Sequence, residues 1–299
     1  MREPSSSSSD GSAPTALGLS RRALVGGAAG IAALAAVGVP AITALVDGPT
    51  GKLVEPLLVA RPFYVAHRGG SRNWPEMSME AYRNSVRNGI DALEVSLART
   101  SDGVWFGLHD KTLDRTSGTR GFVAAEHTWA EVQRHTITAE ATDDPRQPRR
   151  PYMTFRDLAE AYGTTHTIFV DPKWALPAYY PELLEIMDAA VTKPTQTFIA
   201  KAYCTGVEWA AAAASRGYTT WGYYYASEIS ANDVLLPSTQ GSWNLLGLDC
   251  DGATSVWGTL KCYGKPVIGH VAPTRAAAES AIAKGAVGVV VSGVTQVMG

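Results

Sequence analysis

The feature that most constrains the fold of this chain is a regular alternation of short apolar segments with amphipathic ones from Pro62 to Gly299. Short apolar runs rich in β-branched residues are typical of buried strands, and longer amphipathic runs are typical of helices. Strands that alternate with helices over about 240 residues predict an α/β fold with a parallel sheet, and this length is typical of a (β/α)8 barrel of the TIM type. The predicted strands are Tyr64–Ala66, Ala92–Leu97, Val104–Leu108, Thr167–Val170, Thr197–Ala200, Thr219–Tyr225, Asn244–Leu248, Val267–Val271 and Val287–Val291.

Nine candidate strands compete for the eight places of such a barrel, and Asn244–Leu248 has the weakest pattern of the nine. A doubly wound open sheet is the alternative fold, but it usually carries a G-x-G-x-x-G phosphate loop after its first strand. The segment His67-Arg68-Gly69-Gly70 lacks that spacing, which favours the barrel. The predicted helices are Ser78–Asn88, Trp129–His135, Phe155–Tyr162, Pro181–Ala190, Val207–Arg216 and Arg275–Lys284.

Residues 1–46 differ from the rest of the chain in composition. The pair Arg21-Arg22 precedes an uncharged run of Ala, Gly, Val and Leu that extends to Val46. Paired arginines before a moderately apolar segment are typical of a twin-arginine export signal, so we expect an exported protein of the cell envelope or the extracellular space. The apolar run is also long enough to span a bilayer, so membrane contact through residues 23–46 as an uncleaved anchor stays an alternative. Residues 47–61 are expected to be a linker, which leaves residues 62–299 for the barrel.

Charge and cysteine content exclude some classes of function. The formal net charge is -2, whereas nucleic-acid binding usually shows a basic excess, so no nucleic-acid partner is expected. The cysteines Cys204, Cys250 and Cys262 contain no close pair of the kind that zinc sites use. One disulfide among them and three reduced thiols are both consistent with the sequence.

Titratable residues follow four successive predicted strands, and the C-terminal ends of the strands form the active face of a β/α barrel. Two histidines can share acid and base duties near neutral pH, and arginine makes bidentate contacts to phosphate oxygens. Carboxylates suit a hard divalent cation. This combination predicts hydrolysis of a phosphate ester. The residues are His67 and Arg68 after the first strand, Glu94 and Ser96 near the end of the second, His109 and Asp110 after the third, and Asp171 and Lys173 after the fourth.

The same residues resemble the motifs of the glycerophosphodiester phosphodiesterase family. The resemblance is dense from Val65 to Gly121 and thin after Lys173. The family's His-Arg-Gly, Pro-Glu-Asn-Thr, Glu-x-Asp, Thr-x-Asp-Gly, His-Asp and Glu-x-Lys correspond here to His67-Arg68-Gly69, Pro75-Glu76-Met77-Ser78, Glu94-Val95-Ser96, Thr100-Ser101-Asp102-Gly103, His109-Asp110 and Asp171-Pro172-Lys173.

The resemblance implies a TIM-barrel enzyme that hydrolyses a glycerophosphodiester, or a related phospholipid-derived phosphodiester, to glycerol 3-phosphate and an alcohol. It implies that His67 and His109 form the acid–base pair and that Arg68 and Lys173 bind the phosphate. It also implies a divalent cation, Ca²⁺ or Mg²⁺, whose ligands would be Glu94 and Asp171, with Ser96 and Glu76 as further candidates.

The cation ligands depart from the family pattern. Ser96 stands where the family has an aspartate, and Asp171 stands where it has a glutamate. A neutral hydroxyl is a weaker ligand for a hard cation than a carboxylate, so we expect the cation to be weakly held. Two other interpretations stay open: an exported barrel with impaired catalysis that binds phospholipid head groups or an envelope partner, and a phospholipase similar to sphingomyelinase D. His270, on a later predicted strand, is either a further site residue or a structural histidine.

Overall fold

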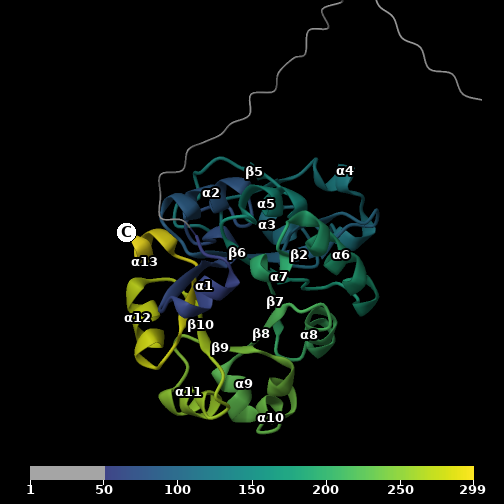
Figure 1. Cartoon of the computed structure of the whole chain (residues 1–299). Helices are drawn as coiled ribbons and strands as arrows, with labels where there is room; N and C mark the ends of the chain where they lie inside the picture. Colours follow the sequence, from purple (N-terminus) through teal and green to yellow (C-terminus); the bar gives the residue numbers. More distant parts are fainter. Residues whose placement is uncertain (1–50) are drawn as a thin grey trace, which may run out of the picture. The chain divides into compact units, whose positions relative to one another are not determined.

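Eight parallel strands close into a barrel in the computed structural model, which describes residues 51–299 (Figure 1). Each strand pairs with the next one around the ring, and the pairing of β1 with both β2 and β11 completes the closure. The predicted (β/α)8 barrel is confirmed. Its strands are β1 (Phe63–Ala66), β2 (Ala92–Arg99), β6 (Thr167–Asp171), β7 (Phe198–Tyr203), β8 (Thr219–Tyr224), β9 (Leu245–Asp249), β10 (Val267–Ala272) and β11 (Gly288–Val291).

Two strands have roles that differ from the predicted ones. The weakest prediction, near Asn244, is the barrel strand β9, whereas the predicted third strand is β3 (Trp105–Gly107), which lies outside the parallel ring. β3 pairs antiparallel with the end of β2, because β2 continues past the barrel and a turn at Gly103, with φ of 87°, reverses the chain. Apolar patterning predicts a strand but carries no information about the direction of its pairing.

The helices of the crossovers surround the barrel and pack on its outer surface (Figure 1). Ser78 and Thr154 are the N-caps of α2 and α5: each side-chain oxygen accepts a backbone N–H three residues later, from Ala81 and Asp157. The helices are α1 (Val54–Val59), α2 (Met79–Arg87), α3 (Asp114–Ser117), α4 (Trp129–Val132), α5 (Phe155–Tyr162), α6 (Tyr180–Ala190), α7 (Pro194–Thr197), α8 (Val207–Ala214), α9 (Ala226–Ala231), α10 (Leu235–Thr239), α11 (Thr254–Lys261), α12 (Arg275–Ala283) and α13 (Val294–Met298).

The segment expected to be a linker contains helix α1, so that prediction is wrong for its described part. Val54 and Leu57 of α1 are buried in the same apolar cluster as Phe63, Phe169 and other side chains of the barrel interior. Just before α1, the carbonyl of Lys52 accepts the backbone N–H of Thr167, the first residue of β6. Helix α1 therefore belongs to the barrel and covers the N-terminal ends of its strands.

Residues 100–154, here named the β2–α5 segment, lie between the second barrel strand and its crossover helix. Besides β3, α3 and α4, this segment contains a small antiparallel pair of β4 (Thr136–Ile137) and β5 (Arg150–Pro151). It has an apolar cluster of its own, which includes Phe106, Leu108 and Tyr152. The segment is therefore an ordered addition to the barrel, and it positions His109.

Two further expectations concern the cysteines and the N-terminus. Cys204, Cys250 and Cys262 are all free thiols, of which the first two are buried and the third is exposed. Between residues 51 and 299, every helix is too short or too polar to cross a bilayer. The predicted export signal and the alternative anchor at residues 23–46 fall outside the described residues.

Candidate active site

The loop after β1 places His67 and Arg68 at the C-terminal end of the barrel. Arg68 has a left-handed backbone with φ of 51°, and Gly69 and Gly70 follow with φ of 75° and 86°, a conformation that favours glycine. The backbone N–H of Arg68 donates to Oε2 of Glu94 at 2.7 Å, which stabilises the unusual conformation of the arginine. The His-Arg-Gly-Gly sequence thus forms a tight turn that is fastened to β2.

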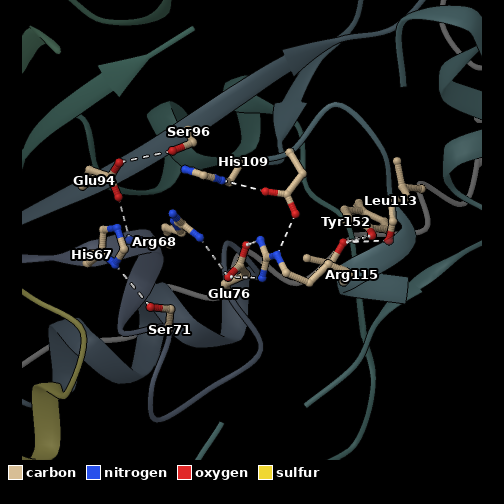
Figure 2. A network of polar contacts seen from close by, with 12 residues as sticks. His67, Arg68, Ser71, Glu76, Glu94, Ser96, His109, Leu113, Arg115 and Tyr152 are labelled. Carbon is tan, nitrogen blue, oxygen red and sulfur yellow. Dashed lines mark hydrogen bonds and ion pairs between the residues drawn. The ribbon is translucent and has the colours of Figure 1, made fainter. Parts of the chain in front are cut away.

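Glu94 and Ser96 are two residues apart on β2, so their side chains lie on the same face of the strand, inside the barrel. Both are fully buried. The hydroxyl of Ser96 donates to Oε1 of Glu94 at 3.3 Å (Figure 2). Burial alone would raise the pKa of Glu94, but the positive charges of Lys201 and Arg68 hold it well below its usual range.

Lys201 is a site residue that sequence reasoning missed. Its ammonium group, from the middle of β7, donates to Oε1 of Glu94 at 2.8 Å and to Oδ2 of Asp171 at 2.7 Å. Burial alone would lower the pKa of Lys201, but Asp171 and Glu94 raise it above its usual value. The sequence signal was a lysine that interrupts the otherwise uncharged strand Phe198–Tyr203, where strands covered on both faces are expected to be apolar.

Asp171 is the last residue of β6, and Lys173 lies two residues after it. Besides Lys201, the Oδ2 atom of Asp171 contacts Nζ of Lys173 at 2.9 Å, and Nζ of Lys173 donates to the hydroxyl of Tyr223 on β8. Burial lowers the pKa of Lys173, and it raises the pKa of Tyr223. The two carboxylates Glu94 and Asp171 therefore lie among two ammonium groups and a neutral phenol.

His109 reaches the site from the β2–α5 segment. Its Nδ1 atom lies 2.7 Å from Oδ1 of Asp110, and Oδ2 of Asp110 accepts from Nε of Arg115 at 2.6 Å. The hydrogen bond to His109 and the guanidinium of Arg115 hold the pKa of Asp110 well below its usual range. Because Nδ1 is engaged by Asp110, the Nε2 atom of His109 is left for chemistry.

Glu76 does not join Glu94 and Asp171. Its carboxylate accepts two bonds from Arg115, at 2.7 Å and 3.0 Å, and one from Nη1 of Arg68 at 3.3 Å. In Figure 2 this carboxylate lies between the two guanidinium groups, and the Arg68 side chain lies between the rings of His67 and His109. Glu76 therefore orients the arginines rather than completing a set of cation ligands.

These side chains surround a cavity of about 50 Å³ that opens beside a groove of about 480 Å³. The buried Nε atom of Arg68 has no hydrogen-bond acceptor among the described residues. Burial, together with Arg68, lowers the pKa of His67 well below its usual value, and burial lowers the pKa of His270 to about 3. The cavity is lined by His67, Arg68, His109, Lys173, Lys201, Trp221, Tyr223, Tyr225, His270, Val271 and Val290.

The residues expected to hold a divalent cation do not fit that role as a set. Nζ of Lys201 lies between Glu94 and Asp171, and Ser96 contributes only a neutral hydroxyl. Within the part of the chain that the structure describes, no three side chains of His, Cys, Asp or Glu gather as ligands of one metal ion. The structure thus brings together His67, Arg68, Glu94, Ser96, His109, Asp171 and Lys173 as predicted, but with a lysine among the carboxylates.

Part of the chain is similar to proteins of one known family. Residues 67–197 match the model of the Glycerophosphoryl diester phosphodiesterase family. Glycerophosphodiester phosphodiesterase 1 of Bos taurus is 33% identical over 110 residues, which cover 36% of this chain and 33% of the relative. The chain therefore matches only about a third of the length of this relative.

Solved structures show the same fold at low sequence identity. The glycerophosphodiester phosphodiesterase of Agrobacterium tumefaciens has a TM-score of 0.63 at 13% identity, covering 80% of this chain and 100% of that one. A phosphodiesterase of Oleispira antarctica, in complex with the product sn-glycerol-3-phosphate, has a TM-score of 0.63 at 17% identity, covering 79% and 95%. The match at residues 67–197 spans His67, His109, Arg68, Glu94, Asp171 and Lys173, so this part of the chain is similar to the glycerophosphodiester phosphodiesterase family.

Proposed function

We propose that this chain hydrolyses a glycerophosphodiester, or a related phospholipid-derived phosphodiester, to glycerol 3-phosphate and an alcohol. The observation that carries the proposal is the partly buried guanidinium of Arg68, whose buried Nε–H has no acceptor among the described residues, between two imidazoles at one small cavity. The complex of the Oleispira antarctica phosphodiesterase with sn-glycerol-3-phosphate supports the same class of substrate.

The phosphodiester would bind by charge and hydrogen bonding. Arg68 and Lys173 both line the cavity, and each presents N–H donors to an anion of the size of a phosphate. A buried donor without an acceptor is costly, so the free Nε–H of Arg68 favours a ligand that supplies an oxygen. The adjoining groove, which shares His109, Lys173 and Tyr223 with the cavity, has room for the alcohol.

The two histidines would divide the proton transfers. His67 is partly buried and neutral near pH 7, because its pKa is lowered, so it can accept the proton of the attacking hydroxyl, from water or from the glycerol moiety. Attack by water gives glycerol 3-phosphate directly, whereas attack by the glycerol hydroxyl gives a cyclic phosphate that a water molecule then opens to glycerol 3-phosphate. The new P–O bond forms as the bond to the leaving alkoxide breaks. His109 donates a proton to that alkoxide, and the carboxylate of Asp110 stabilises its imidazolium form and fixes its orientation.

The test is turnover of a water-soluble glycerophosphodiester by the purified full chain, with release of glycerol 3-phosphate as the readout. His67→Ala and His109→Ala should each lower kcat by about 10²–10⁴-fold, the usual contribution of general acid–base catalysis. His135→Ala is the matched control, because His135 packs against Phe122 and does not line the cavity. Unchanged turnover in both site variants would refute the assignment. Binding of diesters without any turnover would instead support the impaired barrel that binds head groups.

One observation favours a second class of substrate, a lipid with a choline head group. The rings of Tyr203, Tyr223 and Tyr225 lie with their centroids 5.7–6.3 Å apart, and all three line the groove beside the cavity. Aromatic clusters of this kind bind quaternary ammonium groups. A panel of glycerophosphocholine, glycerophosphoethanolamine and sphingomyelin would distinguish the candidates. Preferential turnover of sphingomyelin would favour a sphingomyelinase D-like phospholipase.

We further propose that residues 1–46 export the chain, since Arg21-Arg22 precede an uncharged apolar run. A fusion of residues 1–61 to a reporter enzyme that is active only outside the cytoplasm tests this. Replacing both arginines by lysine should abolish reporter activity if the twin-arginine route is used. Sedimentation of the unprocessed, full-length reporter with membranes would favour the uncleaved anchor.

A further inference from the structure

The strongest departure from the expected site is the position of the Lys201 ammonium between two carboxylates. Nζ lies within hydrogen-bond distance of both Glu94 and Asp171, and the lysine is only 5% exposed. Glu94 and Asp171 are also the two residues that the family resemblance assigns to a divalent cation. A permanent positive charge from the chain itself therefore stands between them.

The charges around this position are already balanced. Glu94 and Asp171 face the ammonium groups of Lys201 and Lys173, and all four side chains are buried or nearly so. Ser96, which lies beside Glu94, adds no negative charge. A divalent cation placed here would meet a cation instead of a third carboxylate, and like charges at this separation in a buried site repel strongly.

Lys201 also faces the cavity where the phosphate is proposed to bind. An ammonium group has three N–H donors, of which two are used by Glu94 and Asp171. Lys201 lines the cavity together with Arg68 and both catalytic histidines, so its third donor can reach an oxygen of the phosphoryl group. It packs over the rings of Tyr223 and Trp221, at 4.9 Å and 5.8 Å from their centroids, which restrict its position.

We propose that Lys201 takes the place of a divalent cation in this site, so that phosphodiester hydrolysis by this chain requires no divalent metal. In this role the ammonium group holds Glu94 and Asp171 in position and neutralises charge on the phosphoryl oxygens as the P–O bond breaks. The part played in catalysis rests on the proposed function, whereas the occupation of the cation position does not.

The first experiment measures metal binding and is independent of turnover. The full chain is titrated calorimetrically with Ca²⁺ and with Mg²⁺, each to about 1 mM, a concentration at which cation sites of moderate affinity are saturated. We expect no binding of either ion. The double variant Ser96→Asp/Lys201→Ala replaces the ammonium by a third carboxylate and should gain binding by at least about tenfold, with Ser96→Asp alone as the matched control. Binding of either ion by the unmodified chain, weakened by Glu94→Gln, would overturn the proposal.

The second experiment measures turnover. The rate should change by less than about twofold after chelation with EDTA, and Lys201→Ala should lower kcat by about 10²–10³-fold, as does loss of one charge-stabilising donor. Lys265→Ala is the matched control, because this lysine donates to backbone carbonyls of Gln240 and Trp243 away from the cavity. Lys201→Gln, which keeps most of the side chain, serves if the alanine variant does not fold.

The possible failures are distinguishable. Loss of turnover on chelation, with recovery on adding Ca²⁺ or Mg²⁺, would overturn the proposal while leaving the hydrolytic function intact. If no diester is hydrolysed under any condition, the proposed function fails. The titration of the unmodified chain and of the double variant would still decide whether Lys201 occupies the position of the cation.

Discussion

Arg115 binds Glu76 through two parallel N–H···O bonds, 2.7 Å and 3.0 Å long, while its Nε donates to Asp110. Glu76 also contacts Arg68. The guanidinium of Arg115 thus connects Asp110, the partner of His109, with Glu76, the partner of Arg68. The relationship predicts that Arg115 positions the site without contacting the substrate.

Arg115→Ala should lower stability by about 2 kcal/mol, since it removes one partner of a buried carboxylate that keeps a second partner in Arg68. It should also lower kcat more than it changes KM, because His109 loses its support through Asp110. Urea denaturation and steady-state kinetics measure the two effects, and Arg115→Lys should restore part of kcat. Arg83→Ala, which breaks an exposed pair with Glu80, should change stability by less than about 0.5 kcal/mol. Equal losses of stability and of kcat in Arg115→Ala and Arg83→Ala would contradict the role of Arg115 in positioning the site.

Asp110→Asn should lower kcat by roughly 10²-fold or more while leaving the fold unchanged. The amide keeps the shape of the carboxylate but removes the charge that stabilises the imidazolium form of His109. Asp144→Asn, at an exposed ion pair with Arg146, is the control and should be neutral. The measurement is kcat across pH 5–9, and a profile identical to that of the unmodified chain would show that Asp110 does not act through His109.

Tyr223→Phe should raise KM by about fivefold, equivalent to about 1 kcal/mol, because Nζ of Lys173 loses the hydroxyl that helps to orient it toward the phosphate. The neighbouring Tyr224→Phe offers a close control. The hydroxyl of Tyr224 forms a hydrogen bond of 2.8 Å with Thr239 on α10, and Tyr224 does not line the cavity. Tyr224→Phe should therefore lower stability without changing KM. Both KM values come from the same turnover assay, and an unchanged KM in Tyr223→Phe would remove Tyr223 from substrate binding.

Stability should fall in mild acid, and His166 should account for a measurable part of the loss. Burial lowers the pKa of His166 from 6.5 to about 4 in the folded chain, and its Nε2 has no hydrogen-bond partner among the described residues. Below pH 6.5 the unfolded chain therefore binds a proton at His166 that the folded chain does not. The free energy of unfolding consequently decreases as the pH falls from 6.5 toward 4.

Between pH 7 and pH 5 the loss from His166 alone is about 2 kcal/mol. Urea denaturation at the two pH values should show it, and His166→Asn, which can still bond Thr165, should reduce the difference by about that amount. A variant with the same pH dependence as the unmodified chain would show that His166 titrates normally in the fold.

Helix α1 should contribute to the stability of the barrel. Leu57 is fully buried against the barrel interior, so Leu57→Ala should cost about 2–5 kcal/mol. Val59, on the same helix, is 82% exposed, and Val59→Ala should have no measurable effect. Thermal and urea denaturation check both variants, and tolerance of Leu57→Ala would show that α1 is dispensable.

Sequence patterns predicted the barrel and most of the candidate site because both depend on local information. A strand that is followed directly by His67, and another that carries Glu94 in an apolar run, can be recognised from neighbouring residues alone. The direction of β3 could not be predicted, since pairing direction depends on a partner strand. Helix α1 was missed because it is six residues long and has no side-chain cap, so only its packing on the barrel stabilises it.

Lys201 was missed for a different physical reason. Its partners Glu94 and Asp171 lie 107 and 30 residues away in the sequence, and only closure of the barrel brings the three together. An ion pair between distant strands leaves no local pattern, whereas a charged residue in a buried strand does. A buried charged residue needs a partner of opposite charge, and the sequence alone does not identify that partner.

The antiparallel strand β3 has a consequence for how a site of this kind can vary. His67 stands on the ring of parallel strands, whereas His109 stands on the β2–α5 segment, which has an apolar cluster of its own. The two histidines proposed to transfer protons thus belong to separately packed modules. Changes in the segment could retune one histidine and the shape of the substrate entrance while the ring, with Lys201 and both carboxylates, stays as it is.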